Sequence, residues 1–200
     1  MADIGTASGS PPRVGRPRSE QSRTAVLRAA SDLMHEVGLR AMTTEAIAGR
    51  SGASKATIYK WWPNKYAVAI EAFLSEMLIE ASDPDTGSAA EDFRIVLRGL
   101  SHFYASPSGR VFAQLIGEAQ FDPVVAAELR DRLIHSRRDA SRAIWDRGVA
   151  RGELRGNVDR EVAIDILFGP ALYRLMTGYA TLDEAAADAV VDGAMRGLAV

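Results

Sequence analysis

The residues best suited to chemistry lie in one stretch, SGASKATIYKWWPNKYA, which runs from residue 51 to residue 67. It contains three lysines and four aromatic side chains, and every lysine of the chain falls within it. Cations interleaved with hydroxyl and aromatic groups suit binding to a polyanion, because phosphates attract positive charge and base edges need hydrogen bonds at close range. The adjacent Trp61 and Trp62 leave three interpretations open: core residues, a platform on which a ligand stacks, or contacts with a charged partner.

Motifs for catalysis and for metal binding are absent from the sequence. It has no GxSxG nucleophile turn, no phosphate-cradling glycine loop and no HExxH pair. Because it has no cysteine, it forms no disulfide and no thiolate zinc site, and no two of its three histidines have ligand spacing. We therefore expect a protein that is not an enzyme and has no metal or cofactor, with a helical enzyme that uses isolated acidic groups as the alternative.

The charge of the chain is distributed unevenly. Residues 1–66 carry ten Lys or Arg against five Asp or Glu, whereas residues 67–200 carry fourteen against twenty-one. A basic end joined to an acidic body predicts that the first part meets a polyanion. No apolar run approaches the roughly 18 residues that span a bilayer, and the N-terminus lacks the apolar segment of a signal peptide. We expect a cytoplasmic protein without a membrane partner.

The elements that position these residues are predicted to be helices. No run of alternating β-branched residues occurs, so the expected fold class is all-α. The Gly-, Ser-, Pro- and Arg-rich start predicts a disordered basic arm, and SDPDTGS (82–88) is a turn that separates a small head from a larger body. We divide the chain into the arm (1–18), a head of three helices (19–66) and the body (67–200). Helices are expected at residues 19–37, 44–50, 55–62, 65–81, 89–104, 108–119, 123–151, 159–177 and 182–198.

The two short helices on either side of Ser51 form a candidate helix-turn-helix. Ala48 is small enough for a close helix crossing, Gly52 tolerates the positive φ of the turn, and Ile58 is a branched anchor that faces back. At about 100° per residue, Ile58 and Trp62 share the inward face of the second helix. A small residue, a cation, a hydroxyl and a phenol lie outward, which suits a helix that enters the major groove; they are Ala56, Lys60, Thr57 and Tyr59.

The segment TTEAIAGRSGASKATIYKWWPNKYAV resembles the DNA-binding signature of the tetracycline-repressor (TetR) family of bacterial regulators. Ala53 stands where the family more often has valine, and Trp61 where histidine is common. The resemblance implies a helix-turn-helix head and a variable helical body that binds a ligand and forms a dimer. It also implies that seven residues contact DNA backbone or bases: Thr44, Ser54, Lys55, Thr57, Tyr59, Trp61 and Lys65.

The arm carries a second hint of DNA binding. Arg13, Arg16 and Arg18 in RVGRPR resemble a short arm that reaches into a narrow minor groove, where arginine is attracted. The alternative is a disordered tail without a contact.

The last two predicted helices are candidates for a dimer interface, because they are apolar around much of their circumference. In the resembled family these helices form a four-helix bundle between subunits; the alternative is a core within one chain. A dimer is also expected because one short recognition helix reads too few bases. The interface residues that we predict are Ile166, Pro170, Tyr173, Arg174, Val190 and Ala194.

Large apolar residues of the body are candidates for the wall of a ligand chamber, although each is also an ordinary core residue. They are Phe103, Phe112, Ile116, Phe121, Trp145 and Phe168. The sequence therefore predicts a homodimeric, sequence-specific repressor that a small-molecule effector of unknown identity releases from a palindromic operator. A helical enzyme and a nonspecific DNA-binding protein without effector control are the alternatives.

Overall fold

A computed structural model of the chain describes residues 16–77 and 84–200, and within these ranges the regular elements are helices. One isolated antiparallel bridge joins Leu154 to Ala199. The all-α prediction is confirmed. The helices are α1 (Arg16–Ala41), α2 (Thr44–Ser51), α3 (Lys55–Trp61), α4 (Lys65–Met77), α5 (Ala89–Ala105), α6 (Pro107–Ala119), α7 (Pro123–Leu129), a π-helical turn η1 (Arg130–Ile134), α8 (His135–Ala150), α9 (Arg160–Thr177) and α10 (Glu184–Leu198).

The first helix differs from the prediction at both ends. It begins at Arg16, three residues earlier than expected, so the backbone of residues 16–18 is helical where an arm was predicted. Arg13 lies outside the described residues, as does the end predicted for the fourth helix at residues 78–81. Gly38 interrupts α1 with a φ of 82° and a ψ of 161°, and one further turn follows it. The glycine is required there because other residues rarely adopt a positive φ.

Helix starts follow the capping chemistry of the sequence. A side-chain oxygen accepts a hydrogen bond from a backbone N–H of the first turn and so satisfies a donor that has no partner within the helix. Residues that do this before helices of the body are Ser88, Ser106, Asp122, Asp159 and Asp183.

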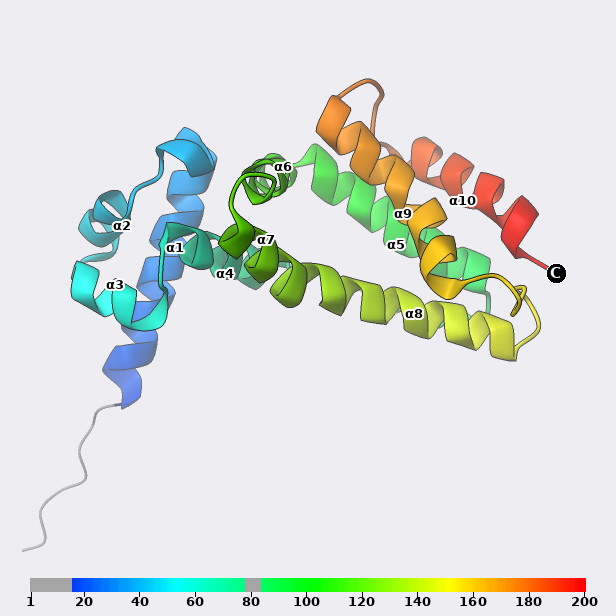
Figure 1. Cartoon of the computed structure of the whole chain (residues 1–200), viewed down its shortest axis with the longest axis horizontal. Helices are drawn as coiled ribbons and strands as arrows, with labels where there is room; N and C mark the ends of the chain where they lie inside the picture. The colour runs from blue at the N-terminus through cyan, green and yellow to red at the C-terminus, as the bar shows by residue number, and fades with distance from the viewer. Residues whose placement is uncertain (1–15, 78–83) are drawn as a thin grey trace, which may run out of the picture.

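The helices form an elongated molecule with α1, α2 and α3 at one end and α5, α8, α9 and α10 at the other (Figure 1). Helices α4, α6 and α7 lie between these ends, and α6 packs against both α1 and α5. The predicted long helix at residues 123–151 is instead α7, η1 and α8 in succession. A π-helical turn admits one extra residue per turn, which helical spacing in the sequence does not reveal.

Two hydrophobic cores hold the molecule together. The first runs from the head into the body and contains Val26, Trp62, Phe73, Phe112 and Leu133 among its buried members. The second lies within the body, between α5, α8, α9 and α10. Because α4 contributes Val68, Ile70 and Phe73 to the first core, a shift of α4 must disturb packing in the head and in the body together.

Candidate functional site

The helix-turn-helix is built by three local devices. Thr43 caps α2 by accepting from the N–H of Ala46 at 3.1 Å, and Ser54 caps α3 by accepting from the N–H of Thr57 at 3.1 Å. Between them Gly52 has a φ of 70°, and its N–H donates to the carbonyl of Ala48 at 3.0 Å. The positive φ predicted for Gly52 is confirmed.

Helix α3 has one buried side and one exposed side. Ile58 and Trp62 are 1% and 2% exposed and pack into the first core. On the other side Tyr59 is 50% exposed and Trp61 is 43% exposed, with Ala56 and Lys60 also exposed. The adjacent tryptophans therefore lie in different environments, and their ring centroids are 6.5 Å apart.

The three lysines of the stretch are held differently. Lys55 forms an ion pair with Glu45 of α2, which raises the pKa of its ammonium, and Lys60 has no ion-pair partner among residues 16–77 and 84–200. Lys65 Nζ donates to the carbonyl oxygens of Leu39, Arg40 and Met42 at 3.2, 3.0 and 3.0 Å.

The ammonium group of Lys65 has a structural role, and its contact with DNA stays a prediction. An ammonium group has three donors, and all three are used to close the C-terminal end of α1. Cations are favourable there because the last carbonyl groups of a helix carry partial negative charge. Thr44, which is also predicted to contact DNA, is 8% exposed.

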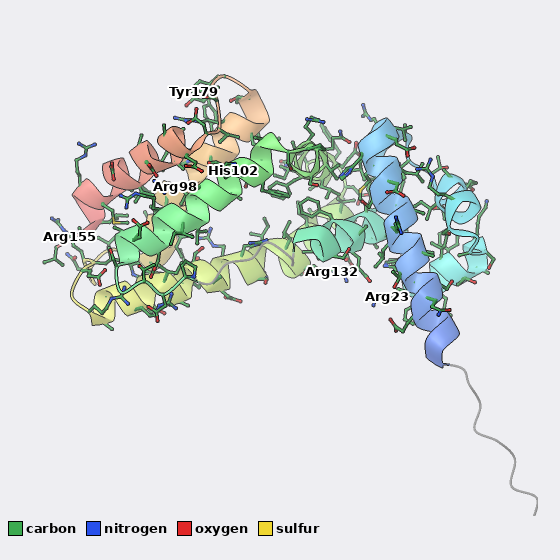
Figure 2. All side chains as sticks on the ribbon, turned by 180° about the vertical axis from the view of Figure 1, so that it is seen from behind. Arg23, Arg98, His102, Arg132, Arg155 and Tyr179 are labelled. Carbon is green, nitrogen blue, oxygen red and sulfur yellow. The ribbon has the colours of Figure 1, made fainter. Side chains whose placement is uncertain are left out.

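Glu71 of α4 joins the head to the body. Its carboxylate accepts from the Trp62 indole N–H at 2.9 Å and from Arg132 of η1 at 3.1 Å, and it pairs with Arg23 of α1. Figure 2 shows Arg23 on α1 and Arg132 near α4, at the junction of head and body. Burial alone would raise the pKa of Glu71, but the hydrogen bonds from Trp62 and Arg132 and the charge of Arg23 hold it below its ordinary value. We call these four residues the Glu71 cluster.

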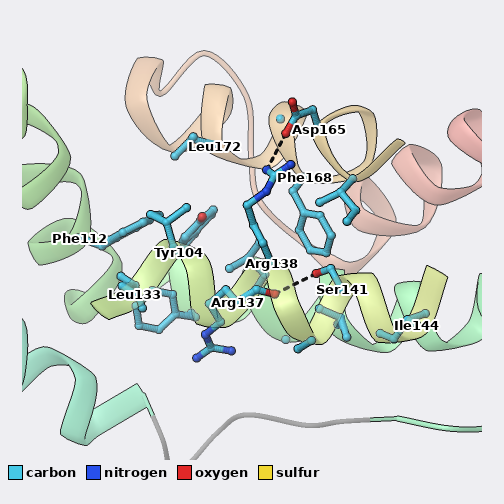
Figure 3. Close-up of a pocket in the computed structure, with 18 of the residues that line it drawn as sticks. Tyr104, Phe112, Leu133, Arg137, Arg138, Ser141, Ile144, Asp165, Phe168 and Leu172 are labelled. Atoms are coloured by element: carbon cyan, nitrogen blue, oxygen red, sulfur yellow. Dashed lines mark hydrogen bonds and ion pairs between the residues drawn. The ribbon is translucent and has the colours of Figure 1, made fainter. Parts of the chain in front are cut away.

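A cavity of about 340 Å³ lies in the body between α5, α6, η1, α8 and α9 (Figure 3). Its apolar wall includes four of the residues predicted for a ligand chamber: Phe103, Phe112, Ile116 and Phe168. The other two do not line it. Phe121 is 89% exposed in the turn after α6, and Trp145 is buried in the second core.

Sequence reasoning missed the polar residues of this cavity. Tyr104, Ser141 and Asp165 line it together with the successive arginines Arg137 and Arg138. Tyr104 follows a predicted lining residue, Phe103, and two adjacent residues of one helix reach the same cavity where it is wide. The arginines carry no such signal, because a helical surface arginine has the same sequence context.

An aromatic stack connects the cavity with α4. The ring of Phe112 lies between Tyr104 and Phe73, with centroid distances of 5.7 Å to each and interplanar angles of 18° and 10°. Tyr104 and Phe112 line the cavity, whereas Phe73 belongs to α4. A displacement of the cavity wall can therefore be transmitted to α4 through aromatic contacts as well as through the Glu71 cluster.

Helix α9 exposes an apolar stripe on the surface of the body. Val162, Ile166, Tyr173 and Met176 are 51%, 46%, 61% and 44% exposed. Of the other residues predicted for an interface, Pro170, Arg174, Val190 and Ala194 are half-buried, and the last two pack against the second core. The Arg174 guanidinium lies over the Tyr179 ring, at the tip of the turn after α9 (Figure 2).

Within the described residues no cluster of three or more acidic, His or Cys side chains has the arrangement of a metal site. No helix in that part of the chain is long and apolar enough to cross a membrane.

Comparison with known proteins covers both ends of the chain. The family model described as "Bacterial regulatory proteins, tetR family" matches residues 26–72, and the one described as "Tetracyclin repressor-like, C-terminal domain" matches residues 83–194. The chain is 43% identical to the uncharacterized HTH-type transcriptional regulator YdeS of Bacillus subtilis, over 89% of this chain and 90% of that protein. It is 28% identical to the DNA-binding transcriptional repressor TetR of Mycobacteroides abscessus, over 88% of this chain and 92% of the relative.

A solved structure agrees with these sequence matches. The TetR family transcription regulator SCO0332 is 32% identical, with a TM-score of 0.77 over 88% of this chain and 98% of that one. The helix-turn-helix geometry and the matches together show that this chain belongs to the tetR family of bacterial regulatory proteins and is a DNA-binding transcriptional regulator.

Proposed function

We propose that the chain works as a cytoplasmic homodimer that reads a palindromic operator with α3, and that a small molecule in the body cavity releases it. The observation that carries the proposal is the division of α3 into two faces. Ile58 and Trp62 fix the helix to the core, while Tyr59, Lys60 and Trp61 lie exposed on a helix of 7 residues. A helix seated in this way can enter a major groove without unfolding the head.

The exposed residues of α3 would divide the DNA contacts between bases and phosphates. Ala56 allows close approach, and the Tyr59 hydroxyl and the Thr57 hydroxyl can hydrogen-bond with bases or phosphates. Lys60 offers a charge to a phosphate, and Ser54 and Lys55 stand at the start of the same helix. Arg16 and Arg18, on the first turn of α1, would add contacts in the minor groove.

A second copy would cover the apolar stripe of α9 together with α10. On α10 the exposed residues include Ala185, Ala189, Gly193 and Gly197, which are spaced by four and allow close approach of a partner helix. A Cβ atom at either glycine would meet nothing within 4 Å, so the chain itself does not fill this surface. A symmetric pair would place two α3 helices on two half-sites, as a palindromic operator requires.

The link between cavity and head would pass through α4. Leu133 and Ile134 of η1 line the cavity, and their neighbour Arg132 donates to Glu71, which also holds Trp62 at the end of α3. An effector that fits better when η1 and α4 are displaced would favour a state in which the two α3 helices no longer match the operator. The border between head and body would then fall along α4, which agrees with the two family models ending at residue 72 and beginning at residue 83.

Fluorescence anisotropy with labelled duplexes tests the proposal. The intergenic DNA beside the gene that encodes the chain is compared with unrelated duplex of equal length at about 150 mM salt. We expect the intergenic duplex to bind at least about 10³-fold more tightly, as specific regulators do. Equal affinity for both duplexes would identify a nonspecific DNA-binding protein instead.

Two variants of exposed α3 residues test whether DNA affinity can fall without a loss of stability. Tyr59→Phe and Lys60→Ala should weaken operator binding while the melting temperature stays unchanged, because both side chains are exposed. Arg155→Ala, on the opposite end of the molecule (Figure 2), is the control and should leave DNA affinity unchanged.

A further inference from the structure

We infer that the body cavity binds an uncharged, largely apolar small molecule that presents one oxygen acceptor to the Tyr104 hydroxyl. This inference rests on the proposed function, in which the cavity is the effector site, and it adds the chemical class of the effector. Three independent features of the cavity carry it: its walls, its one hydroxyl that lacks a partner, and the pairing of its charges.

The walls favour a compact apolar molecule. The volume of about 340 Å³ is near the lower end of the range of about 300–1,000 Å³ that is typical of small-molecule sites. Aromatic and branched side chains from α5, α6, η1, α8 and α9 surround it. Gly99 of α5 also lines the cavity, and a Cβ atom there would meet nothing within 4 Å. Gly99 is itself exposed, so a side chain added at this position would extend into open space beside the cavity.

The Tyr104 hydroxyl is the polar group in need of a partner. Tyr104 is 9% exposed, and its hydroxyl has no hydrogen bond to any residue of the described ranges 16–77 and 84–200. Figure 3 shows this hydroxyl on the same side of α8 as Leu172 and Phe168, within the space that the cavity residues enclose. The hydroxyl borders the open space of the cavity, so a ligand oxygen in that space can accept a hydrogen bond from it.

The protonation state of Tyr104 fixes its role as a donor. Burial raises the pKa of the Tyr104 hydroxyl far above its ordinary value, and the positive charge of Arg137 offsets this only in part. The hydroxyl is therefore protonated throughout the neutral range, and its O–H can donate to a ketone, ester, amide or ether oxygen.

Arg138, one of the charged residues that border the cavity, is already paired with carboxylates. Arg138 donates to Asp165 at 2.7 Å and to Glu161 at 2.9 and 2.7 Å, so its guanidinium is held by two carboxylates. Figure 3 shows the Arg137 guanidinium on the other side of α8 from Asp165 and Phe168. A carboxylate beside Arg138 would have to break the pairs of its guanidinium with Asp165 and Glu161, which is costly.

The test uses 6-propionyl-2-dimethylaminonaphthalene, an uncharged fluorescent ketone, as the probe. Three naphthalenes of matched shape then displace it: 2-acetylnaphthalene has the oxygen acceptor, 2-ethylnaphthalene lacks it, and 2-naphthoate carries a negative charge. We expect the ketone to compete about 3- to 10-fold better than the ethyl compound, because one net hydrogen bond separates them. We expect 2-naphthoate to compete at least about tenfold less well than the ketone.

Variants locate the site and assign the hydrogen bond. Tyr104→Phe should abolish the preference for the ketone over the ethyl compound, and Tyr179→Phe, on the exposed turn after α9, should leave it unchanged. Gly99→Leu should fill the cavity and abolish saturable probe binding without unfolding the body, since its Cβ meets no neighbour. Probe binding that survives Gly99→Leu would place the probe elsewhere and overturn the inference.

Two further results distinguish failure of the ligand class from failure of the proposed function. A preference for 2-naphthoate, or no saturable probe binding to a protein that binds its operator, would overturn the ligand class and leave the proposed function standing. If the wild-type protein fails to distinguish its operator from unrelated DNA, the proposed function fails, whatever the naphthalenes show.

Discussion

Replacing Glu71 by glutamine tests the junction of head and body. Glutamine has nearly the same shape as glutamate, and its carbonyl oxygen can still accept from Trp62, but it cannot pair with Arg23 and Arg132 as an anion. We expect Glu71→Gln to lower the free energy of unfolding by about 2 kcal/mol at pH 7, through loss of charge alone.

The magnitude follows from the exposure of the partners. The side chains of Arg23 and Arg132 are 38% and 37% exposed, so solvent screens their pairs with Glu71, and each contributes roughly 0–1 kcal/mol. The bond from Trp62, which is 2% exposed, changes from a charged to a neutral acceptor and weakens by about 1 kcal/mol. For a chain of this length, a total of about 2 kcal/mol corresponds to a melting temperature lower by roughly 4–8 °C.

The stability difference between the wild type and Glu71→Gln should also depend on pH. The pKa of Glu71 is lowered in the folded protein, so its contribution is fully present above the ordinary carboxyl pKa of about 4.3 and is lost as the pH falls through the folded value. The difference between the wild type and Glu71→Gln should therefore be largest at pH 7 and shrink below about pH 4. Urea unfolding at several pH values, at one fixed protein concentration, measures it.

A matched control removes a carboxylate beside the same arginine. Glu20 lies 3.9 Å from Arg23, but its side chain is 64% exposed, so Glu20→Gln should change stability by less than about 0.5 kcal/mol at any pH. If Glu71→Gln changes stability as little as Glu20→Gln does, the Glu71 cluster does not hold the head to the body. A difference that stays constant between pH 7 and pH 4 would likewise show that the charge is not the cause.

Three further predictions concern other parts of the molecule. Trp61→Phe should leave the melting temperature unchanged and weaken binding to all DNA sequences. Lys60→Ala should also reduce, by about 1, the slope of the logarithm of the DNA-binding constant against the logarithm of salt concentration. Anisotropy titrations measure DNA binding by both variants. If the chain forms the proposed dimer, Ile166→Glu should convert it to a monomer in sedimentation, because the substitution places a charge in the exposed stripe of α9. Gly148→Ala should lower the free energy of unfolding by about 1–3 kcal/mol, because its Cβ would lie 2.7 Å from two side-chain atoms of the second core. Gly49→Ala is the control: its Cβ meets nothing within 4 Å, so it should raise the free energy of unfolding by about 0.5–1 kcal/mol. Urea unfolding measures both.

Local chemistry made the head predictable from sequence. Gly52, Ser54 and Ile58 act within one or two helical turns, so their spacing alone determines the turn, the cap and the buried face of α3. The role of Lys65 could not be found in this way, because it depends on carbonyl groups that lie about 25 residues earlier, just after the glycine kink of α1.

The body was predictable only as a set of helices. Phe121 and Trp145 have the same apolar chemistry as the residues that line the cavity, and only the packing of α5, α8 and α9 decides which side chains face it. The π-helical turn η1 rotates the start of α8 relative to α7, so helical periodicity extended from Pro123 assigns the wrong faces beyond Arg130.

The Glu71 cluster sets a limit on how an effector can act. Arg132 is the member of the cluster on η1, and its pair with Glu71 contributes roughly 0–1 kcal/mol. An effector that uncouples η1 from α4 therefore changes the equilibrium between head positions by at most about that amount, which is roughly fivefold. A larger release of DNA would need the aromatic stack of Tyr104, Phe112 and Phe73 to move as well. Arg132→Gln separates the two routes, because it removes the arginine but leaves the Trp62 bond to Glu71 and the stack in place. With 2-acetylnaphthalene as the bound probe, Arg132→Gln should reduce the ratio of operator dissociation constants with and without probe by up to about fivefold, because its pair with Glu71 contributes roughly 0–1 kcal/mol. An unchanged ratio would assign the coupling to the aromatic stack alone.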